Sequence, residues 1–177
     1  MKLQATLLLF LMLGIVSATT IIPVSVERLT NESSHVVEAR VVSSESKWNP
    51  QHTLIFTYTK IEVMKTLKGA AQSSLVVKQI GGSAEGYTQK VAGVRYASPG
   101  EQTLLFLRPS AQKDGTFEIT GLMQGNFAVH KSASGETLVS NGIPGVSAYQ
   151  QGSTGEYTGT HMQLQELETR VQKAAQQ

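Results

Sequence analysis

Alternating apolar and polar residues in the central part of the chain predict β-strands. The longest such stretch covers residues 54–67 and stops at Lys68-Gly69. Its fourteen residues exceed the usual length of a strand, and toward its N-terminal half both faces mix apolar with polar side chains. We therefore expect a strand that bends or bulges and takes part in two sheets, as a small closed barrel requires.

Shorter apolar runs on both sides of this stretch predict further strands. They cover residues 36–42, 75–80, 103–107 and 127–129, with Phe117, Ile119 and Leu122 in one more. The first run ends in the polar residues 43–47, and turn sequences follow at 48–51, 81–82, 99–101 and 113–115. Five or six short strands with few helices between them favour an antiparallel barrel over a parallel α/β sheet.

Two helices are predicted, one before and one after these strands. In residues 25–34, Val26, Leu29 and Thr30 share one helical face, and Ser25 with Arg28 forms half of a capping box. From Thr160 onward, apolar residues recur at spacings of three, four and three, at Leu164, Leu167, Val171 and Ala174. This stripe, with acidic side chains early and basic ones late, predicts an amphipathic C-terminal helix.

The domain organisation follows from these elements. Residues 19–131 form one barrel domain, residues 132–159 are rich in glycine and serine, and residues 160–177 form the terminal helix. We expect the middle segment to be a surface loop with one short extended piece at 137–139. The predicted fold class is mainly β, a small closed antiparallel barrel with a short N-terminal helix and an amphipathic C-terminal helix.

The first residues have the three parts of a secretory signal peptide. Met1-Lys2 is positive, residues 7–16 are almost continuously apolar, and Val16-Ser17-Ala18 supplies small residues before a cleavage site. The apolar run is too short for a membrane helix, which needs about 20 residues. We predict cleavage after Ala18, an exported mature chain of residues 19–177, and no membrane association after cleavage.

Composition narrows the function classes. The chain has no cysteine, which excludes disulfides, thiolate zinc sites and a cysteine nucleophile. Since eukaryotic secreted domains of this size commonly use disulfides, a bacterial periplasmic or extracellular location is favoured. A net charge of +2 argues against a protein that works by neutralising nucleic-acid phosphates.

No motif predicts catalysis or a cofactor. The four histidines, His35, His52, His130 and His161, are widely spaced, and the chain has no His-Glu-x-x-His or Gly-x-Ser-x-Gly sequence. The acidic residues form no suggestive pair for glycoside hydrolysis. We predict no catalytic residue, no metal site and no cofactor, and interpret the histidines as structural or solvated.

The order of the predicted segments resembles a known family. Residues 36–42, 56–69, 104–107 and 115–120 are similar, in that order, to the netrin-module or TIMP-like (metalloproteinase-inhibitor) domain. Lys68-Gly69 at the end of the long strand, and Pro99-Gly100-Glu101 before the apolar run at 104–107, also resemble a group of exported bacterial proteins of unknown function. The resemblance covers residues 19–129 and implies a barrel of the oligonucleotide/oligosaccharide-binding (OB) type with flanking helices.

The resemblance also implies which segment binds the partner. In the inhibitors of that family, the α-amino group and first carbonyl chelate a protease zinc, and the second residue enters the specificity pocket. Thr19 and Thr20 occupy the corresponding positions here. The family has disulfide-bonded cysteines at its first and third positions, where this chain has Thr19 and Ile21. An N-terminal segment without those disulfides has to lose conformational entropy on binding.

The leading hypothesis is an exported, non-catalytic binding module that recognises a protein partner, for example a metalloprotease. Its predicted contacts are Thr19 and Thr20 in the N-terminal segment, with Trp48 and Tyr96 in loops. The alternative is a carbohydrate or envelope-polysaccharide binder, because Phe56 and Tyr58 share one strand face and exposed rings serve as stacking platforms. An enzyme is the third hypothesis, and nucleic acid is not expected as a ligand.

Overall fold

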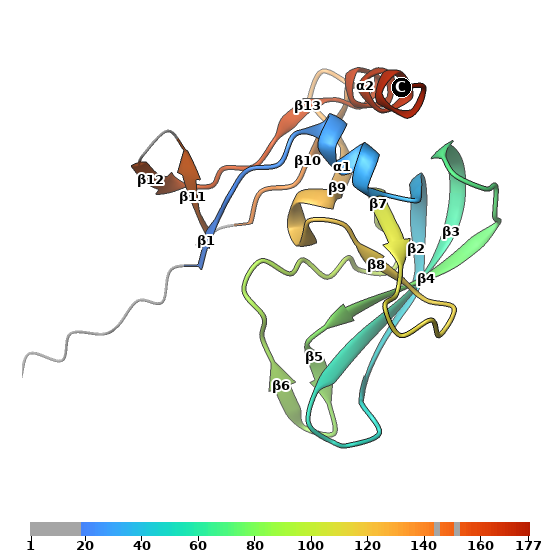
Figure 1. Ribbon diagram of the computed structural model, residues 1–177, viewed down its shortest axis with the longest axis vertical. Coiled ribbons are helices and arrows are strands. Elements are labelled where there is room, and N and C mark those ends of the chain that lie inside the picture. Colours follow the sequence, from blue (N-terminus) through green and yellow to red (C-terminus); the bar gives the residue numbers. More distant parts are fainter. Residues whose placement is uncertain (1–18, 144–145, 151–152) are drawn as a thin grey trace, which may run out of the picture.

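Five strands close into a barrel in the central part of the chain (Figure 1). They are β2 (His35–Trp48), β3 (Ile55–Lys68), β4 (Ser74–Ile80), β7 (Gln102–Pro109) and β8 (Phe117–Ile119). The structure is a computed structural model that describes residues 19–143, 146–150 and 153–177, so the predicted signal peptide, 1–18, lies outside the described residues. The predicted fold class, mainly β with a small closed barrel, is confirmed. Its strand pairs are antiparallel except for the single parallel bridge between β4 and β8.

Closure depends on a long, bulged hairpin. β2 and β3 pair along their whole length, with register shifts between Val36 and Val37, between Glu38 and Ala39, and between Val41 and Ser43. The pairing of β4 with β3 is limited to residues 56–62, in the first half of β3. Bulges increase local twist and bend a strand. The expectation of an overlong, irregular strand is therefore confirmed, but β3 takes part in one sheet and not in two.

Eight further strands among the described residues lie around the barrel. β9 (Asn126–Lys131), β10 (Thr137–Ser140) and β13 (His161–Gln163) extend the main sheet beyond β7. β5 (Gly82–Ala84) and β6 (Tyr87–Gln89) form a separate hairpin, and β1 (Thr19–Ile21), β11 (Val146–Gln150) and β12 (Ser153–Glu156) form a third sheet. Figure 1 shows this third sheet projecting from the body beside β10 and β13.

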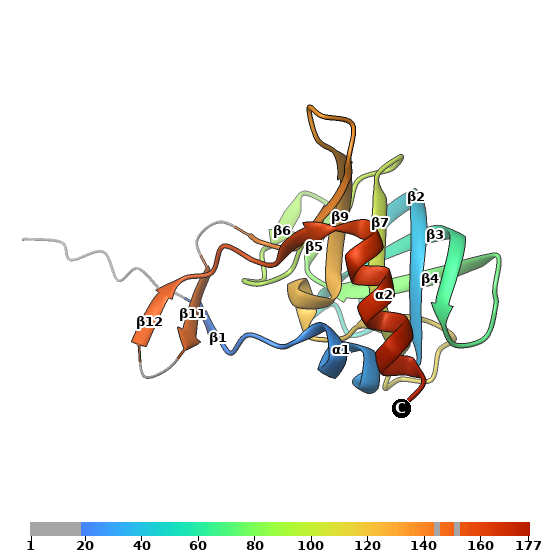
Figure 2. The same cartoon turned by 90° about the horizontal axis from the view of Figure 1, so that it is seen from above.

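Three helical segments complete the fold: α1 (Val26–Glu32), the 3-10 helix η1 (Leu122–Gly125) and α2 (Leu164–Ala175). The Ser25 hydroxyl accepts a hydrogen bond from the Arg28 backbone N–H at 3.2 Å, as the half capping box predicts. Leu167, Val171 and Ala174 are the buried stripe of α2, as the spacing predicts. Figure 2 shows α2 and α1 lying side by side over one face of the main sheet.

Two apolar cores lie on opposite sides of the barrel wall. The interior holds aliphatic side chains from all five strands, among them Val37, Val41, Ile61, Val77, Leu105 and Ile119. The second core lies between the outer face and the helices, and contains Val36, Leu104, Phe106, Phe127, Leu29, Leu167 and Val171. β7 is therefore buried on both faces, which accounts for its unbroken apolar sequence.

Three sequence predictions were wrong in detail. The polar residues 43–47 stay within β2, because an exposed strand edge tolerates serine and lysine when its partner strand is long. Residues 132–159, expected as a loop with an extended piece at 137–139, contain β10 and also β11 and β12. Leu122, expected in a strand, begins η1, because Gly121 turns the backbone with φ of 70°.

A buried carboxyl group joins α2 to the barrel. The Lys65 ammonium on β3 lies 2.5 Å from Glu168 Oε1 on α2 and 3.7 Å from Glu38 Oε1 on β2. Glu38 Oε1 is buried and accepts no hydrogen bond from the described residues. Burial, together with the neighbouring Glu168 carboxyl group, raises the pKa of Glu38 to about 7, although Lys65 opposes the shift. Glu38 therefore binds its proton more tightly in the folded chain than in the unfolded one.

This arrangement predicts a loss of stability at rising pH. Between the ordinary pKa of 4.5 and the folded value of about 7, the folded state binds more protons, so stability falls as pH rises through this window. We expect the free energy of unfolding in urea to drop by about 2 kcal/mol from pH 5 to pH 8. Glu27 and Asp114, whose pKa values are held at about 2, contribute only below this window.

The Glu38→Gln variant, a neutral isostere, should lose most of this pH dependence and be the more stable protein at pH 8. Glu62→Gln, at an exposed position on β3, is the matched control and should keep the wild-type slope. An unchanged slope in Glu38→Gln would show that another group controls the junction.

Candidate binding surface

The N-terminal segment lies in the structure as a short edge strand. β1 pairs in parallel with β11, Thr20 opposite Ser147 and Ile21 opposite Ala148, and it is an edge strand of its sheet. Ile22, which follows β1, is 71% exposed. The segment thus presents a large apolar side chain to solvent directly after a strand whose other edge carries no partner among the described residues.

Gln124 holds this segment against the body of the protein. Its side-chain amide accepts a hydrogen bond from the Val24 backbone N–H at 2.7 Å and donates one to the Ile22 carbonyl at 3.1 Å. Gln124 is only 6% exposed, and the Asn141 side chain donates to its backbone carbonyl at 2.7 Å. The amide therefore takes the place of a neighbouring strand and fixes residues 22–24 without a covalent link.

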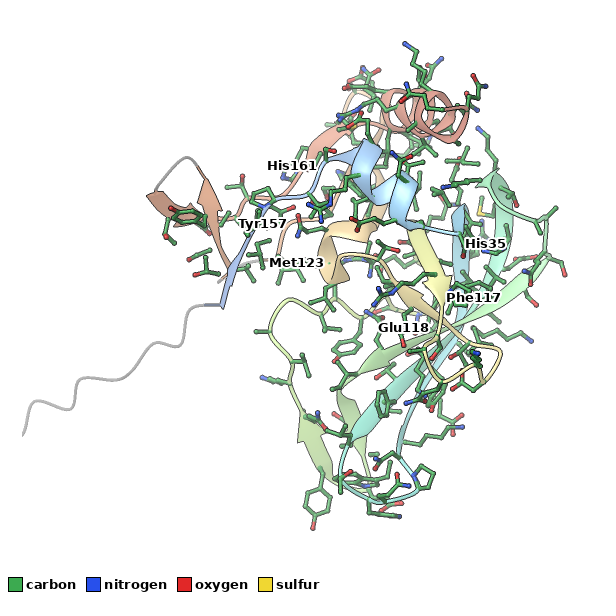
Figure 3. The ribbon with its side chains drawn as sticks, in the orientation of Figure 1. His35, Phe117, Glu118, Met123, Tyr157 and His161 are labelled. Carbon is green, nitrogen blue, oxygen red and sulfur yellow. The ribbon has the colours of Figure 1, made fainter. Side chains whose placement is uncertain are left out.

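An apolar cavity lies beside this anchor. Its volume is about 220 Å³, and its lining comes from β1, the loop after β6 and η1: Ile21, Ala92, Gly93, Gly121, Leu122, Met123 and Gln124. Met123 also packs with Tyr157, Val146 and Ala148 in a small apolar core (Figure 3). Leu122 is 51% exposed and has the left-handed backbone, with φ of 55°. A residue other than glycine has a conformational cost in this backbone region. Here the leucine side chain is also exposed to solvent.

A second cavity, of about 240 Å³, shares Leu122 with the first. It opens between β4 and β8, and its lining is Phe56, Lys78, Gln79, Ile80, Val94, Arg108, Gln112, Glu118, Ile119 and Leu122. The two cavities and the N-terminal segment form one surface with Leu122 between them. We call the second one the seam cavity.

The predicted loop contacts lie in different surroundings. Trp48 stacks on His52 with ring centroids 5.7 Å apart and meets Tyr87 of β6 edge-on. β1 is drawn apart from β5 and β6 in both Figure 1 and Figure 2, so Trp48 is not brought together with Thr19 and Thr20. The Tyr96 hydroxyl donates to the Ile80 carbonyl at 2.6 Å, and burial raises its pKa. Tyr96 thereby fastens the loop after β6 to the end of β4.

The predicted ligand face on β3 is occupied by lysine side chains. The Lys78 ammonium lies 4.8 Å from the ring centroid of Phe56 and 5.5 Å from that of Tyr58. The Lys47 ammonium lies 4.5 Å from the ring centroid of Tyr58. The structure does bring both rings together, half-buried on one face of the barrel. Cation–π contacts of this kind cover part of each ring that a sugar would stack on.

His35, His52 and His161 make ordinary packing or hydrogen-bond contacts. His35 meets the Phe117 ring edge-on at 5.0 Å, and His161 Nε2 lies 2.8 Å from the Thr158 carbonyl oxygen (Figure 3). Within residues 19–143, 146–150 and 153–177, no three histidine or acidic side chains are grouped as a metal site would require. None of the helices in those same ranges combines the length and apolar character of a membrane span.

Sequence reasoning missed Leu122, Met123 and Gln124. The only signal available was the pair of glycines, Gly121 and Gly125, that brackets them. Only glycine fits at position 125, since a Cβ there would lie 2.1 Å from the Thr120 carbonyl oxygen. Two glycines four residues apart indicate a tight turn but do not say which side chains the turn presents.

The comparisons leave the family open. No known protein-family model matches the chain, and no curated protein is significantly similar to it.

The anchoring role of Gln124 can be tested. In Gln124→Leu, the Val24 N–H and the Ile22 carbonyl lose their partners, and unsatisfied buried polar groups cost about 1–3 kcal/mol each. We expect a loss of about 2 kcal/mol in the free energy of unfolding and much faster hydrogen exchange at the Val24 amide. Gln165→Leu, at an exposed position on α2, should change neither. Unchanged protection of Val24 would refute the anchoring role.

Proposed function

We propose that this protein is an exported, non-catalytic binding module that recognises a protein partner through its N-terminal segment and the adjacent loops. The interface comprises β1, Ile22 and the exposed Leu122. This proposal extends the resemblance to TIMP-like domains, whose inhibitory ridge corresponds to residues 19–23 of this chain.

One observation carries the proposal: Ile22 is highly exposed on a backbone that is already immobilised. Leaving a large apolar side chain in water forgoes roughly 1.5–3 kcal/mol of burial energy. The flanking backbone is held by β11 on one side and by the Gln124 amide on the other. A segment held in this way has lost its conformational entropy before a partner arrives, which favours affinity. The missing disulfides of the resembled family are thus replaced by hydrogen bonds.

The surroundings of Ile22 favour an extended peptide segment as the contacting part of the partner. β1 is short and lies at the edge of its sheet, so a strand of the partner can add to it through main-chain hydrogen bonds. The apolar cavity of about 220 Å³ beside it accepts one apolar side chain of that strand. The substrate-binding cleft of a protease presents extended backbone of this kind.

The alternative function, binding of an envelope polysaccharide, is favoured by the adjacent Phe56 and Tyr58 rings. Their lysine neighbours restrict access to the ring faces, so we place this function second. The two functions require different surfaces, and single substitutions separate them.

The test begins with the mature chain, residues 19–177, used to capture partners from the exported fraction of its source. The affinity of the captured protein, once purified, is then measured by calorimetry against the wild type and Ile22→Asp. We expect Ile22→Asp to bind at least tenfold more weakly, since an aspartate cannot be buried at the interface. Met64→Asp places the same change at an exposed position on β3 and should bind like the wild type.

Further variants distinguish the partner class. If the partner is a metalloprotease whose zinc is chelated by the Thr19 amine, one residue added before Thr19 abolishes binding. Polysaccharide binding predicts the reverse pattern, with loss in Tyr58→Ala and no effect of the extension or of Ile22→Asp. Release of a product from a substrate, without a stoichiometric complex, would overturn the non-catalytic assignment.

A further inference from the structure

The barrel has one weak closure, between β4 and β8. These strands pair at a single position, Val77 opposite Phe117, whereas β8 pairs with β7 at three successive positions. Beyond Val77, the end of β4 and the strand β8 are no longer paired, and the seam cavity of about 240 Å³ occupies the space. A water molecule takes about 30 Å³ in the liquid, so the cavity has room for roughly eight waters.

Side chains, in place of a sixth strand, satisfy polar groups at the open end of β4. The Ile80 backbone carbonyl accepts a hydrogen bond from the Tyr96 hydroxyl. The side-chain amide of Gln79 donates one to the Arg95 backbone carbonyl at 3.1 Å. Arg95 is itself held by Asn126 at 2.9 Å and by an ion pair with Glu101. These contacts hold the loop that carries Val94 at a fixed place along one wall. These contacts therefore maintain the opening between β4 and β8 in the folded protein.

One part of the cavity wall is apolar and another part is polar. Phe56, Ile80, Val94, Ile119 and Leu122 supply the apolar surface. The polar groups come from Lys78 on β4, Arg108 on β7, Glu118 on β8, and Gln112. A ligand that fits both parts has a compact apolar body and one polar head.

The carboxylates at the polar end already have partners. Glu118, labelled in Figure 3, accepts from the Ser110 hydroxyl at 3.2 Å and from Arg108 at 3.4 Å. Asp114 accepts from Lys78 at 3.0 Å and from both the backbone N–H and the hydroxyl of Thr116. The remaining capacity for hydrogen bonding is therefore on the donor side.

Arg108 supplies most of those donors, because Lys78 already donates hydrogen bonds to Asp114 and to Gln112. Lys78 is only 7% exposed and carries a positive charge. Although burial lowers the pKa of Lys78, the hydrogen bond to the Asp114 carboxylate and its negative charge, with a contribution from Tyr58, outweigh burial, so the net direction is upward. Arg108 has five N–H donors and gives one of them to Glu118 within the described part of the chain. An arginine with free donors beside a buried lysine favours a carboxylate.

We propose that the seam cavity binds a small carboxylic acid with an aromatic or branched apolar body. The carboxylate lies against Arg108, near Lys78, and the apolar body lies between Phe56, Ile80 and Leu122. This site shares Leu122 with the interface proposed around Ile22, but its polar end at Arg108 and Lys78 lies outside that interface, so either function can exist without the other.

The probe for this site is 3-phenylpropionate, with its neutral amide as the matched ligand. Binding is followed by backbone amide NMR shifts, which should concentrate at Ile80, Val94, Ile119 and Leu122. For a ligand of about eleven heavy atoms, we expect a Kd on the order of 1 mM. The amide should bind about tenfold more weakly, because it cannot form charge-assisted hydrogen bonds.

Two variants test the two ends of the cavity. Arg108→Gln should weaken 3-phenylpropionate about tenfold and leave the amide unaffected, whereas Arg40→Gln, at an exposed position on β2, should change neither. Leu122→Gly removes part of the apolar wall and suits the positive φ at that position, so it should weaken both ligands in a folded protein.

Equal binding of acid and amide, or shifts centred away from the cavity, would overturn the proposal. So would an Arg108→Gln variant that binds the acid like the wild type. Arg108→Gln should keep the partner affinity that Ile22→Asp loses. Failure of this site is thus distinguishable from failure of the proposed function.

Discussion

Burial of β7 on both of its faces is the constraint on which the rest of the structure depends. One face of this strand contributes Leu105 and Leu107 to the barrel interior, and the other contributes Leu104 and Phe106 to the core under the helices. Because the strand pairs with β2, β8 and β9 as well, it connects the barrel to the outer sheet. A polar side chain at any of positions 104–107 would therefore lie in one of the two cores, and the strand has none there.

The same constraint explains why the candidate sites lie where they do. A five-stranded barrel closes only if its strands curve strongly, and the bulges in the β2–β3 hairpin supply that curvature on one side. On the opposite side, closure falls to β8, which is three residues long and pairs with β4 once. The loop after β8 then turns through Gly121 into η1, which brings Leu122 to the seam and Gln124 to the N-terminal segment. Both surfaces are consequences of how this small barrel is completed.

The sequence predicted the elements whose own side chains determine them. The stripe from Leu164 to Ala174, the Ser25 cap and the alternation in 54–67 are local signals, and all three correspond to real elements. β11 and β12 pair with each other as a local hairpin, but their sequences are short and rich in Gly, Ser, Thr and Gln, so no apolar alternation marked them as strands. The role of Gln124 could not be predicted because it contacts backbone about 100 residues away. Sequence patterns within one segment reflect interactions between residues that are close in sequence. The candidate surfaces are made of contacts between residues that are far apart in sequence.

The N-terminal segment illustrates how one physical requirement can be met in two ways. A binding segment must be ordered before it meets its partner if affinity is not to be spent on ordering it. In the resembled family, disulfides supply that order, and a chain without cysteine has to find it elsewhere. Here the order comes from hydrogen bonds to a buried amide, which are stronger where water is excluded. A hydrogen-bonded anchor can open and close in equilibrium, whereas a disulfide in an oxidising compartment persists. The backbone at Ile22 and Val24 is thus held by contacts that can open without a chemical reaction.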